Sequence, residues 1–75
     1  MVRLPVISGV AAVRAFEQSG WTLVRQSGSH MIMTKPDVNE VLSIPNHREL
    51  KRGTLRGLIR KAGLDVRIFV ALMTG

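Results

Sequence analysis

Residues 21–34 read WTLVRQSGSHMIMT and predict a β-hairpin, around which the rest of the fold can be arranged. Apolar and polar side chains alternate over Trp21–Gln26, as in a strand with one buried face. Ser27-Gly28 has the composition of a tight hairpin turn. The extended pattern resumes over Ser29–Thr34 as a second strand. His30 therefore lies near the start of that strand, just after the turn.

Every second side chain of an ideal strand lies on the same face. Trp21, Leu23 and Arg25 are therefore expected on one face of the first strand, with Trp21 in the core. In the second strand, His30 and Ile32 are expected to share a face.

The segments on either side of the hairpin predict helices and a third strand. The first helix is predicted over residues 9–19, since Ser8 can cap its N-terminus and Gly20 is suited to end it. After the hairpin, Pro36–Asn39 is typical of a turn and residues 40–44 of a third strand, closed by Pro45. Helical spacing places Gly9, Ala12, Val13, Phe16 and Gly20 on one face of the first helix, and marks Leu55, Leu58, Ile59 and Ala62 as the buried stripe of the second.

The second helix is predicted to begin near Gly53-Thr54 and to end at Gly63. A short last helix follows, capped by Asp65, with Phe69 and Leu72 facing inward. The predicted order is α-β-β-β-α-α, an α+β fold with a three-stranded antiparallel sheet and helices packed on one face. Because the chain has 75 residues and no linker-like stretch, we expect residues 1–75 to form a single domain.

The chain is strongly basic, with 11 Lys and Arg against five Asp and Glu and a net charge of +6. This charge indicates an anionic partner such as nucleic acid, a membrane surface or an acidic protein. No apolar stretch approaches the roughly 20 residues that cross a membrane. Pro5 and Arg14 argue against a secretory signal in the apolar run Leu4–Val13, and the lack of cysteine fits a reducing compartment. We expect a cytoplasmic protein with no membrane partner.

The acidic residues give no sign of a metal site. Two-metal nucleases need several carboxylates around ions about 3.5–4 Å apart. The five acids of this chain lie far apart in the sequence with no paired spacing: Glu17, Asp37, Glu40, Glu49 and Asp65. We therefore expect no metal and no other cofactor.

His30 is the candidate catalytic residue. RNA supplies its own nucleophile, the ribose 2′-hydroxyl, once a base removes its proton, and histidine exchanges a proton near neutral pH. Gly28 allows close approach of the backbone to a phosphate, and Ser29 offers a hydrogen bond. On spacing alone, a structural role for this histidine is the alternative. The proton for the leaving oxygen has four possible sources, water, Ser29, Lys51 or His30 itself, and we expect slow turnover.

Six of the 11 Lys and Arg lie between residues 48 and 61. If the second helix includes Arg52, a spacing of four places Arg52, Arg56 and Arg60 along one exposed face. Together with Lys51 and Lys61, this row is the candidate RNA-binding surface; a merely solvated helix face is the alternative.

His47 follows the third predicted strand in Pro45-Asn46-His47. Two interpretations stay open, a loop residue that orders the turn and a catalytic group.

Four ordered blocks of this chain resemble the HicA toxins, small messenger-RNA interferases of bacterial toxin–antitoxin pairs. The similarity covers nearly the whole length, from Leu4 to the last helix. Its most specific blocks are Gly20-Trp21, Arg25–His30, Pro45 with His47, and Leu50–Leu55 with Ile59 and Ala62-Gly63.

The resemblance implies a double-stranded-RNA-binding-like fold and metal-independent cleavage of mRNA by the histidine of the Gly-Ser-His block, here His30. It also implies a HicB-like antitoxin that covers the active face and represses the operon. Arg25 and Gln26 of the same block join the candidate RNA-binding residues. Val10 and Ala11 stand where the family tends to have polar residues, and indicate an extra apolar contact with the partner.

The favoured function is an RNA endonuclease in which His30 acts as general base or acid. One alternative is a non-catalytic RNA-binding module of the same fold. The other is an interaction protein whose charge binds an acidic partner.

Overall fold

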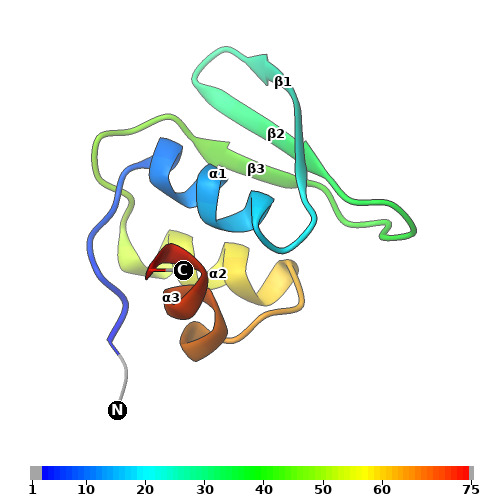
Figure 1. Ribbon diagram of the computed structural model, residues 1–75. Coiled ribbons are helices and arrows are strands. Elements are labelled where there is room, and N and C mark those ends of the chain that lie inside the picture. Colours follow the sequence, from blue (N-terminus) through cyan, green and yellow to red (C-terminus); the bar gives the residue numbers. More distant parts are fainter. Residues whose placement is uncertain (1–2, 75) are drawn as a thin grey trace.

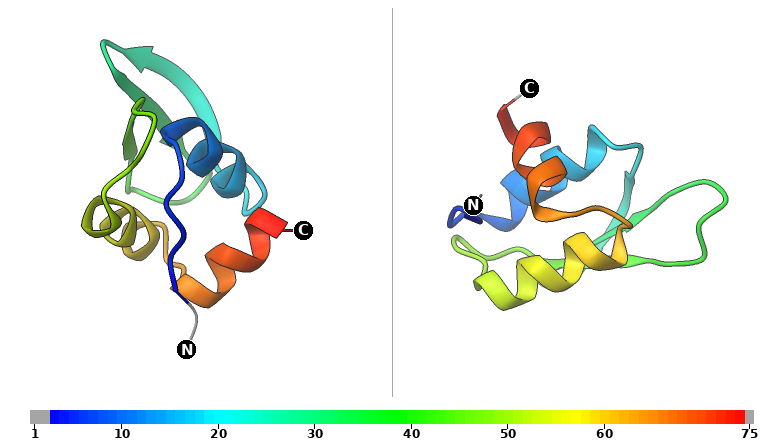
Figure 2. Two further views of the ribbon diagram at one scale, coloured as in Figure 1. Left: turned by 90° about the vertical axis from the view of Figure 1, so that its left-hand side faces the viewer. Right: turned by 90° about the horizontal axis from the view of Figure 1, so that it is seen from below.

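The computed structural model describes residues 3–74 and has its helices and strands in the predicted order. The elements are α1 (Gly9–Glu17), β1 (Thr22–Ser27), β2 (His30–Thr34), β3 (Leu42–Pro45), α2 (Arg52–Lys61) and α3 (Val66–Thr74). The strands form one antiparallel sheet in the order β1-β2-β3. The helices gather on one side of this sheet (Figures 1 and 2). The predicted α+β architecture is therefore confirmed.

Side-chain caps begin α1 and α3. The Ser8 hydroxyl oxygen accepts a hydrogen bond from the Ala11 amide at 3.0 Å, and an Asp65 carboxylate oxygen accepts one from the Ile68 amide at 2.8 Å. Each cap satisfies an amide that has no partner within the helix. Both predicted caps are confirmed.

Glycines of positive φ end α1 and α2. At Gly20, where φ is 100°, the Trp21 amide donates to the Phe16 carbonyl and the Gly20 amide to the Glu17 carbonyl. These two bonds form a Schellman motif, which requires a left-handed residue after the helix. The motif tightens the last turn, so α1 itself ends at Glu17 rather than at residue 19. Gly63, with a φ of 77°, ends α2 in the same way.

The core lies between the helices and the sheet. Phe16 of α1 and Phe69 of α3 are fully buried, with their ring centroids 5.0 Å apart at 51°. Trp21 is 3% exposed, as predicted. The buried apolar residues are Leu4, Ala12, Val13, Ala15, Phe16, Trp21, Met31, Met33, Leu42, Ile44, Leu50, Leu55, Leu58, Ile59 and Phe69. The predicted faces of α1 and α2 belong to this core at Ala12, Val13, Phe16, Leu55, Leu58 and Ile59, and Gly9 is also buried. Ala62 is only partly buried, and Gly20 is exposed because it lies beyond the end of α1.

The hairpin turn lies one residue later than predicted. Ser27 pairs with His30, so the two-residue loop is Gly28-Ser29 and β2 begins at His30 rather than at Ser29. Gly28 has a φ of 61° and Ser29 does not have a positive φ. A positive φ at the first loop residue alone is the geometry of a type II′ turn, which favours glycine there. The position of the glycine decides the position of the turn.

The prediction that Leu23 and Arg25 share a face is wrong. Leu23 pairs with Met33 and Arg25 pairs with Ile32, so the register shifts by one residue between them. Val24 is the extra residue of a β-bulge, and a bulge reverses the faces of the residues that follow it. Leu23 therefore lies on the helix side of the sheet and Arg25 on the other side.

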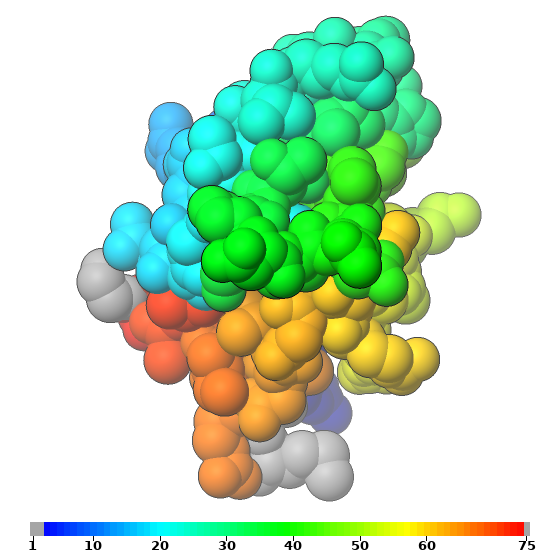
Figure 3. All heavy atoms as spheres, turned by 90° about the vertical axis from the view of Figure 1, so that its right-hand side faces the viewer, coloured from blue at the N-terminus to red at the C-terminus, as the bar shows by residue number. Residues whose placement is uncertain are grey.

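The loop between β2 and β3 projects from the body of the protein (Figures 1 and 3). It begins with a turn in which the Val38 amide donates to the Lys35 carbonyl at 3.2 Å, with Asp37 at a φ of 64°. The strand after the loop is Leu42–Pro45, later than the predicted residues 40–44. No helix within residues 3–74 is long and apolar enough to cross a membrane.

Candidate active site

His30 is exposed on the side of the sheet away from the helices. Its neighbour Met31 is 4% exposed and packs toward the helices, so the alternation of β2 turns His30 to the opposite face. Its partners in the neighbouring strands are Ser27 of β1 and Pro45 of β3. Within residues 3–74 no helix covers this open face (Figure 2), so the imidazole is accessible to a large substrate.

The β-bulge brings Arg25 to the same face as His30. Arg25 pairs with Ile32, and Ile32 shares the face of His30, as predicted. Diagonal neighbours on one face of an antiparallel pair are about 7–8 Å apart, within reach of a long arginine side chain. Arg25 is exposed and can therefore offer a positive charge to an anion bound at His30.

The other residues of the predicted block are divided between the turn and the opposite face. Gly28 and Ser29 form the turn next to His30, and both are exposed. Gln26 pairs with Met31, which puts it on the helix side of the sheet, and its side-chain amide donates to the Gly28 carbonyl at 3.4 Å. Gln26 is therefore placed to support the turn rather than to share the face of His30.

A small hollow lies beside this site, between the end of β3 and the start of α2. Its volume is about 240 Å³. The residues that line it are Pro45, His47, Glu49, Leu50, Lys51 and Thr54. Of the residues in the predicted basic surface, Lys51 alone lines this hollow. The hollow begins at Pro45, the strand partner of His30.

The arginine row runs along α2, away from the hollow. The helix begins at Arg52, so Arg52 belongs to α2, as the predicted row requires. Arg52, Arg56 and Arg60 are all exposed. At a rise of 1.5 Å per residue, Arg52 and Arg60 are about 12 Å apart. The Arg52 side chain donates to the Leu4 carbonyl at 3.2 Å, so part of its hydrogen-bonding capacity is used within the fold.

Lys61 at the end of the row lies 3.8 Å from a Glu40 carboxylate oxygen. Both side chains are exposed, so solvent screens this pair and it contributes little to stability. The pair nevertheless places a negative charge at this end of the row.

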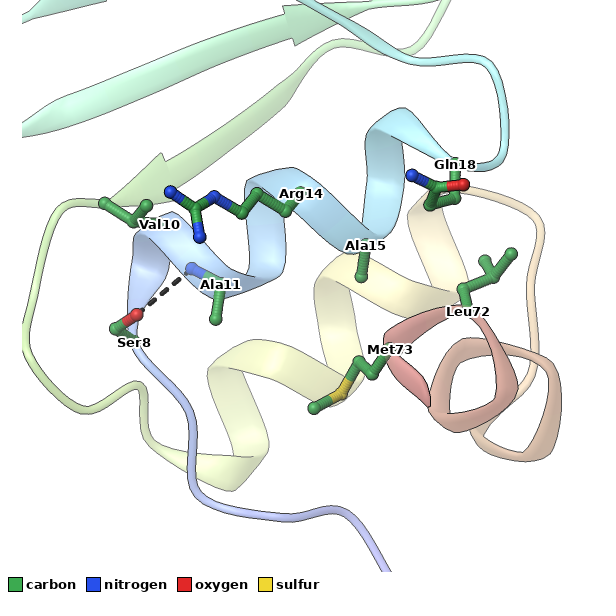
Figure 4. A pocket seen from close by; sticks show the side chains of 8 residues that line it. All are labelled: Ser8, Val10, Ala11, Arg14, Ala15, Gln18, Leu72 and Met73. Atoms are coloured by element: carbon green, nitrogen blue, oxygen red, sulfur yellow. Dashed lines mark hydrogen bonds between the residues drawn. The ribbon is translucent and has the colours of Figure 1, made fainter. Parts of the chain in front are cut away.

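A larger hollow of about 370 Å³ lies between α1 and α3 (Figure 4). Arg14 and Gln18 line it from α1, and Leu72 and Met73 line it from α3. Val10 and Ala11 also line it, with Val10 43% exposed. The hollow holds no histidine or carboxylate. The predicted contact of Val10 and Ala11 with a partner stays a prediction.

No three His, Cys, Asp or Glu side chains within residues 3–74 come close enough together to hold a metal ion. His30, Arg25 and Lys51 are instead the groups that could act on a phosphodiester, through proton transfer and positive charge.

The chain belongs to the HicA toxin family. Residues 11–64 match the family described as the HicA toxin of bacterial toxin–antitoxin systems, and this range includes the hairpin, β3 and α2. Membership of this family implies an antitoxin as partner. No curated protein sequence matches the chain at a significant level.

The alternation of apolar and polar side chains breaks at Leu23-Val24, which is a weak local sign of the bulge, but only the pairing with β2 locates it. The hollow has no such sign in the sequence. Glu49 and Thr54 line the hollow with His47 because the loop after β3 folds back on α2. The turn, by contrast, could have been placed one residue later from the sequence, because a type II′ turn favours glycine at its first loop position and Gly28 is the glycine of this segment.

Proposed function

We propose that this protein is a metal-independent endoribonuclease, an mRNA interferase of a toxin–antitoxin pair, in which His30 is the catalytic histidine. The observation that supports this proposal is the exposure of His30 on an uncovered sheet face, with Arg25 on the same face, in a chain of the HicA family. The open face suits a polymeric substrate, because RNA can lie across it without entering a cavity.

In the proposed reaction, His30 accepts the proton of a ribose 2′-hydroxyl as the 2′-oxygen bonds to the adjacent phosphorus. Negative charge then develops on the phosphoryl oxygens, and Arg25 stabilises it. The exposed turn residues Gly28 and Ser29 allow the RNA backbone to approach and offer a further hydrogen bond. The products are a 2′,3′-cyclic phosphate and a 5′-hydroxyl end.

RNA is proposed to bind from the open sheet face past Lys51 and along the α2 row of Arg52, Arg56 and Arg60, with Lys61 at its end. Phosphate contacts of this kind depend strongly on salt and little on sequence. A HicB-like antitoxin is proposed to neutralise the toxin in the cytoplasm by covering the face that carries His30. Gln26 supports this surface through its bond to the turn.

The test compares the wild-type protein with His30→Ala on an end-labelled messenger RNA in the presence of a chelator. We expect the wild type to produce fragments that end in 2′,3′-cyclic phosphate, and His30→Ala to cleave at least about 100-fold more slowly. RNA affinity of the variant should stay within about twofold, since the positive charges remain. Thr22→Ala, at the far end of the sheet, is the control and should cleave like the wild type.

Undiminished cleavage by His30→Ala contradicts the assignment of the histidine. Wild-type protein that binds RNA in a salt-dependent way but never shortens it is a non-catalytic RNA-binding module instead. Loss of cleavage by the wild type in chelator, restored by a divalent ion, contradicts metal independence.

A further inference from the structure

The loop that lines the small hollow is held in place by three backbone hydrogen bonds to two separate parts of the chain, the hairpin turn and residues 7–9 at the start of α1. The Asn46 amide donates to the Ser29 carbonyl at 2.6 Å, the Gly9 amide to the His47 carbonyl at 2.9 Å, and the Leu50 amide to the Ile7 carbonyl at 2.8 Å. His47 is thus positioned through its main chain, while its side chain is exposed and lines the hollow. A residue with only a loop-ordering role would not need an imidazole there.

The hollow begins at the strand partner of His30. Pro45 pairs with His30 in the sheet and also forms one wall of the hollow. Neighbouring strands lie about 4.8 Å apart, so this wall is one strand spacing from the backbone of His30. An RNA phosphodiester bound at His30 can therefore extend its next atoms over Pro45 toward the hollow.

The groups around the hollow suit a phosphate and its leaving oxygen. Lys51 and His47 supply nitrogen donors, and Thr54 a hydroxyl group. Glu49 is the one carboxylate among the lining residues, and it faces these groups from the same loop. The first turn of α2 has neither a side-chain cap nor an acidic residue, so its amides add positive potential near Lys51. At about 240 Å³ the hollow is smaller than a typical ligand pocket, as befits one segment of a polymer.

We propose that this hollow is the leaving-group side of the ribonuclease site, where Lys51 binds the RNA phosphate and His47 donates the proton that the departing 5′-oxygen requires. The inference rests on the proposed function of His30. It gives His47 a catalytic role, and it assigns a donor for the proton that a single histidine leaves unassigned.

The proton transfers balance in this scheme. His30 takes the proton of the 2′-hydroxyl, the 2′-oxygen forms a bond to phosphorus, and the bond from phosphorus to the 5′-oxygen breaks. His47 in its protonated form gives its proton to that 5′-oxygen. Solvent then returns a proton to His47 and removes one from His30, so no external reactant is consumed.

The decisive experiment uses His47→Gln with two versions of one RNA, cut at a bond that the wild type is known to cleave. In one version the leaving atom is the natural 5′-oxygen, and in the other it is a bridging 5′-sulfur. A thiol has a pKa of about 8.5, so a thiolate leaves without help from an acid. We expect His47→Gln to cleave the natural bond about 100-fold more slowly and the sulfur-containing bond within threefold of the wild-type rate.

Three further variants separate this inference from a structural role. Arg48→Gln removes a neighbouring charge in the same loop, outside the residues that line the hollow, and should cleave both RNAs like the wild type. Lys51→Met should weaken RNA binding about tenfold, the contribution of one charge-assisted hydrogen bond. His30→Ala should be slow on both RNAs, because the attacking hydroxyl still needs a base.

The outcomes are distinguishable. Equal slowing of His47→Gln on both RNAs, or wild-type rates on both, overturns the role of His47 while the function of His30 stands. Active His30→Ala contradicts the proposed function itself.

Discussion

The β1–β2 hairpin and the α1–α3 pair lie at opposite extremes of burial. Phe16 and Phe69 are fully buried where α1 meets α3. In contrast, every residue of β1 is exposed, and β2 buries only Met31 and Met33. Yet the hairpin carries His30 and Arg25, whereas the hollow of α1 and α3 has no histidine or carboxylate. The residues proposed to act on RNA are therefore exposed and lie apart from the fully buried rings, so substitutions at the two places should affect cleavage and stability separately.

Phe16→Ala should have the largest effect on stability. Truncating a fully buried phenylalanine removes about 3–5 kcal/mol through lost burial and the cavity left behind. A domain of 75 residues has a total stability of about 4–11 kcal/mol, so the variant should lose between about a quarter and all of it. Urea unfolding followed by circular dichroism measures this loss.

His30→Ala is the matched comparison for Phe16→Ala. Its unfolding free energy should stay within about 0.5 kcal/mol of the wild type, since the side chain is exposed. A large loss of stability in His30→Ala would mean that the His30 side chain itself contributes to the packing of the fold.

Gly9→Ala should have an intermediate effect on stability, because Gly9 lies where α1 packs against the sheet. A Cβ at Gly9 would collide with the backbone carbonyl oxygen of Pro45, so the end of β3 must move. We expect a loss of about 1–3 kcal/mol, as in other overpacked sites. Cleavage by the folded fraction should also slow, because Pro45 is the strand partner of His30.

Gly57→Ala is the control for this substitution. Gly57 lies inside α2 with open space around its Cβ position, so alanine there should stabilise the helix by about 0.5–1 kcal/mol. Opposite signs for the two glycines, measured by urea unfolding, support the close approach of α1 to β3. A neutral Gly9→Ala would show that this contact is absent.

Replacing both Arg56 and Arg60 by glutamine should have the smallest effect on stability, within about 0.5 kcal/mol. Its effect should appear in RNA binding instead. Each lost phosphate contact on single-stranded RNA reduces the slope of log affinity against log salt by about 0.7, so the double variant should lose about 1.4. Arg67→Gln on α3 removes one charge and is the control for each single variant, Arg56→Gln or Arg60→Gln; it should leave the slope unchanged, and a loss of about 0.7 there would mean that binding follows net charge alone.

Local signals predicted most of the fold correctly. Ser8 and Asp65 cap their helices because a side-chain oxygen reaches an amide three residues away, which depends only on nearby sequence. Gly20 and Gly63 end helices because only glycine adopts a positive φ without strain. Apolar spacing identified the buried faces of α1 and α2 for the same reason, since helical periodicity is a local property.

The candidate site was predicted less completely than the fold. The sequence singled out His30 and its exposed block, and the basic residues before and within α2. It assigned Arg25 to the face of Leu23, and only the shifted pairing with β2 moves Arg25 to the face of His30. It also left the role of His47 open, because the backbone bonds that hold His47 and its neighbour Asn46 come from Gly9 and Ser29, far away in the sequence.

By itself, the sequence determined the order and approximate positions of the helices and strands, the buried faces of α1 and α2, and that the protein is cationic. These properties depend on backbone conformation and on periodicity over a few residues. Only the tertiary structure decided which side chains share a surface with His30, because strand register, the bulge and the hollow arise from hydrogen bonds between distant segments. Such bonds join backbone groups that every residue has, so the amino-acid sequence carries no local sign of them.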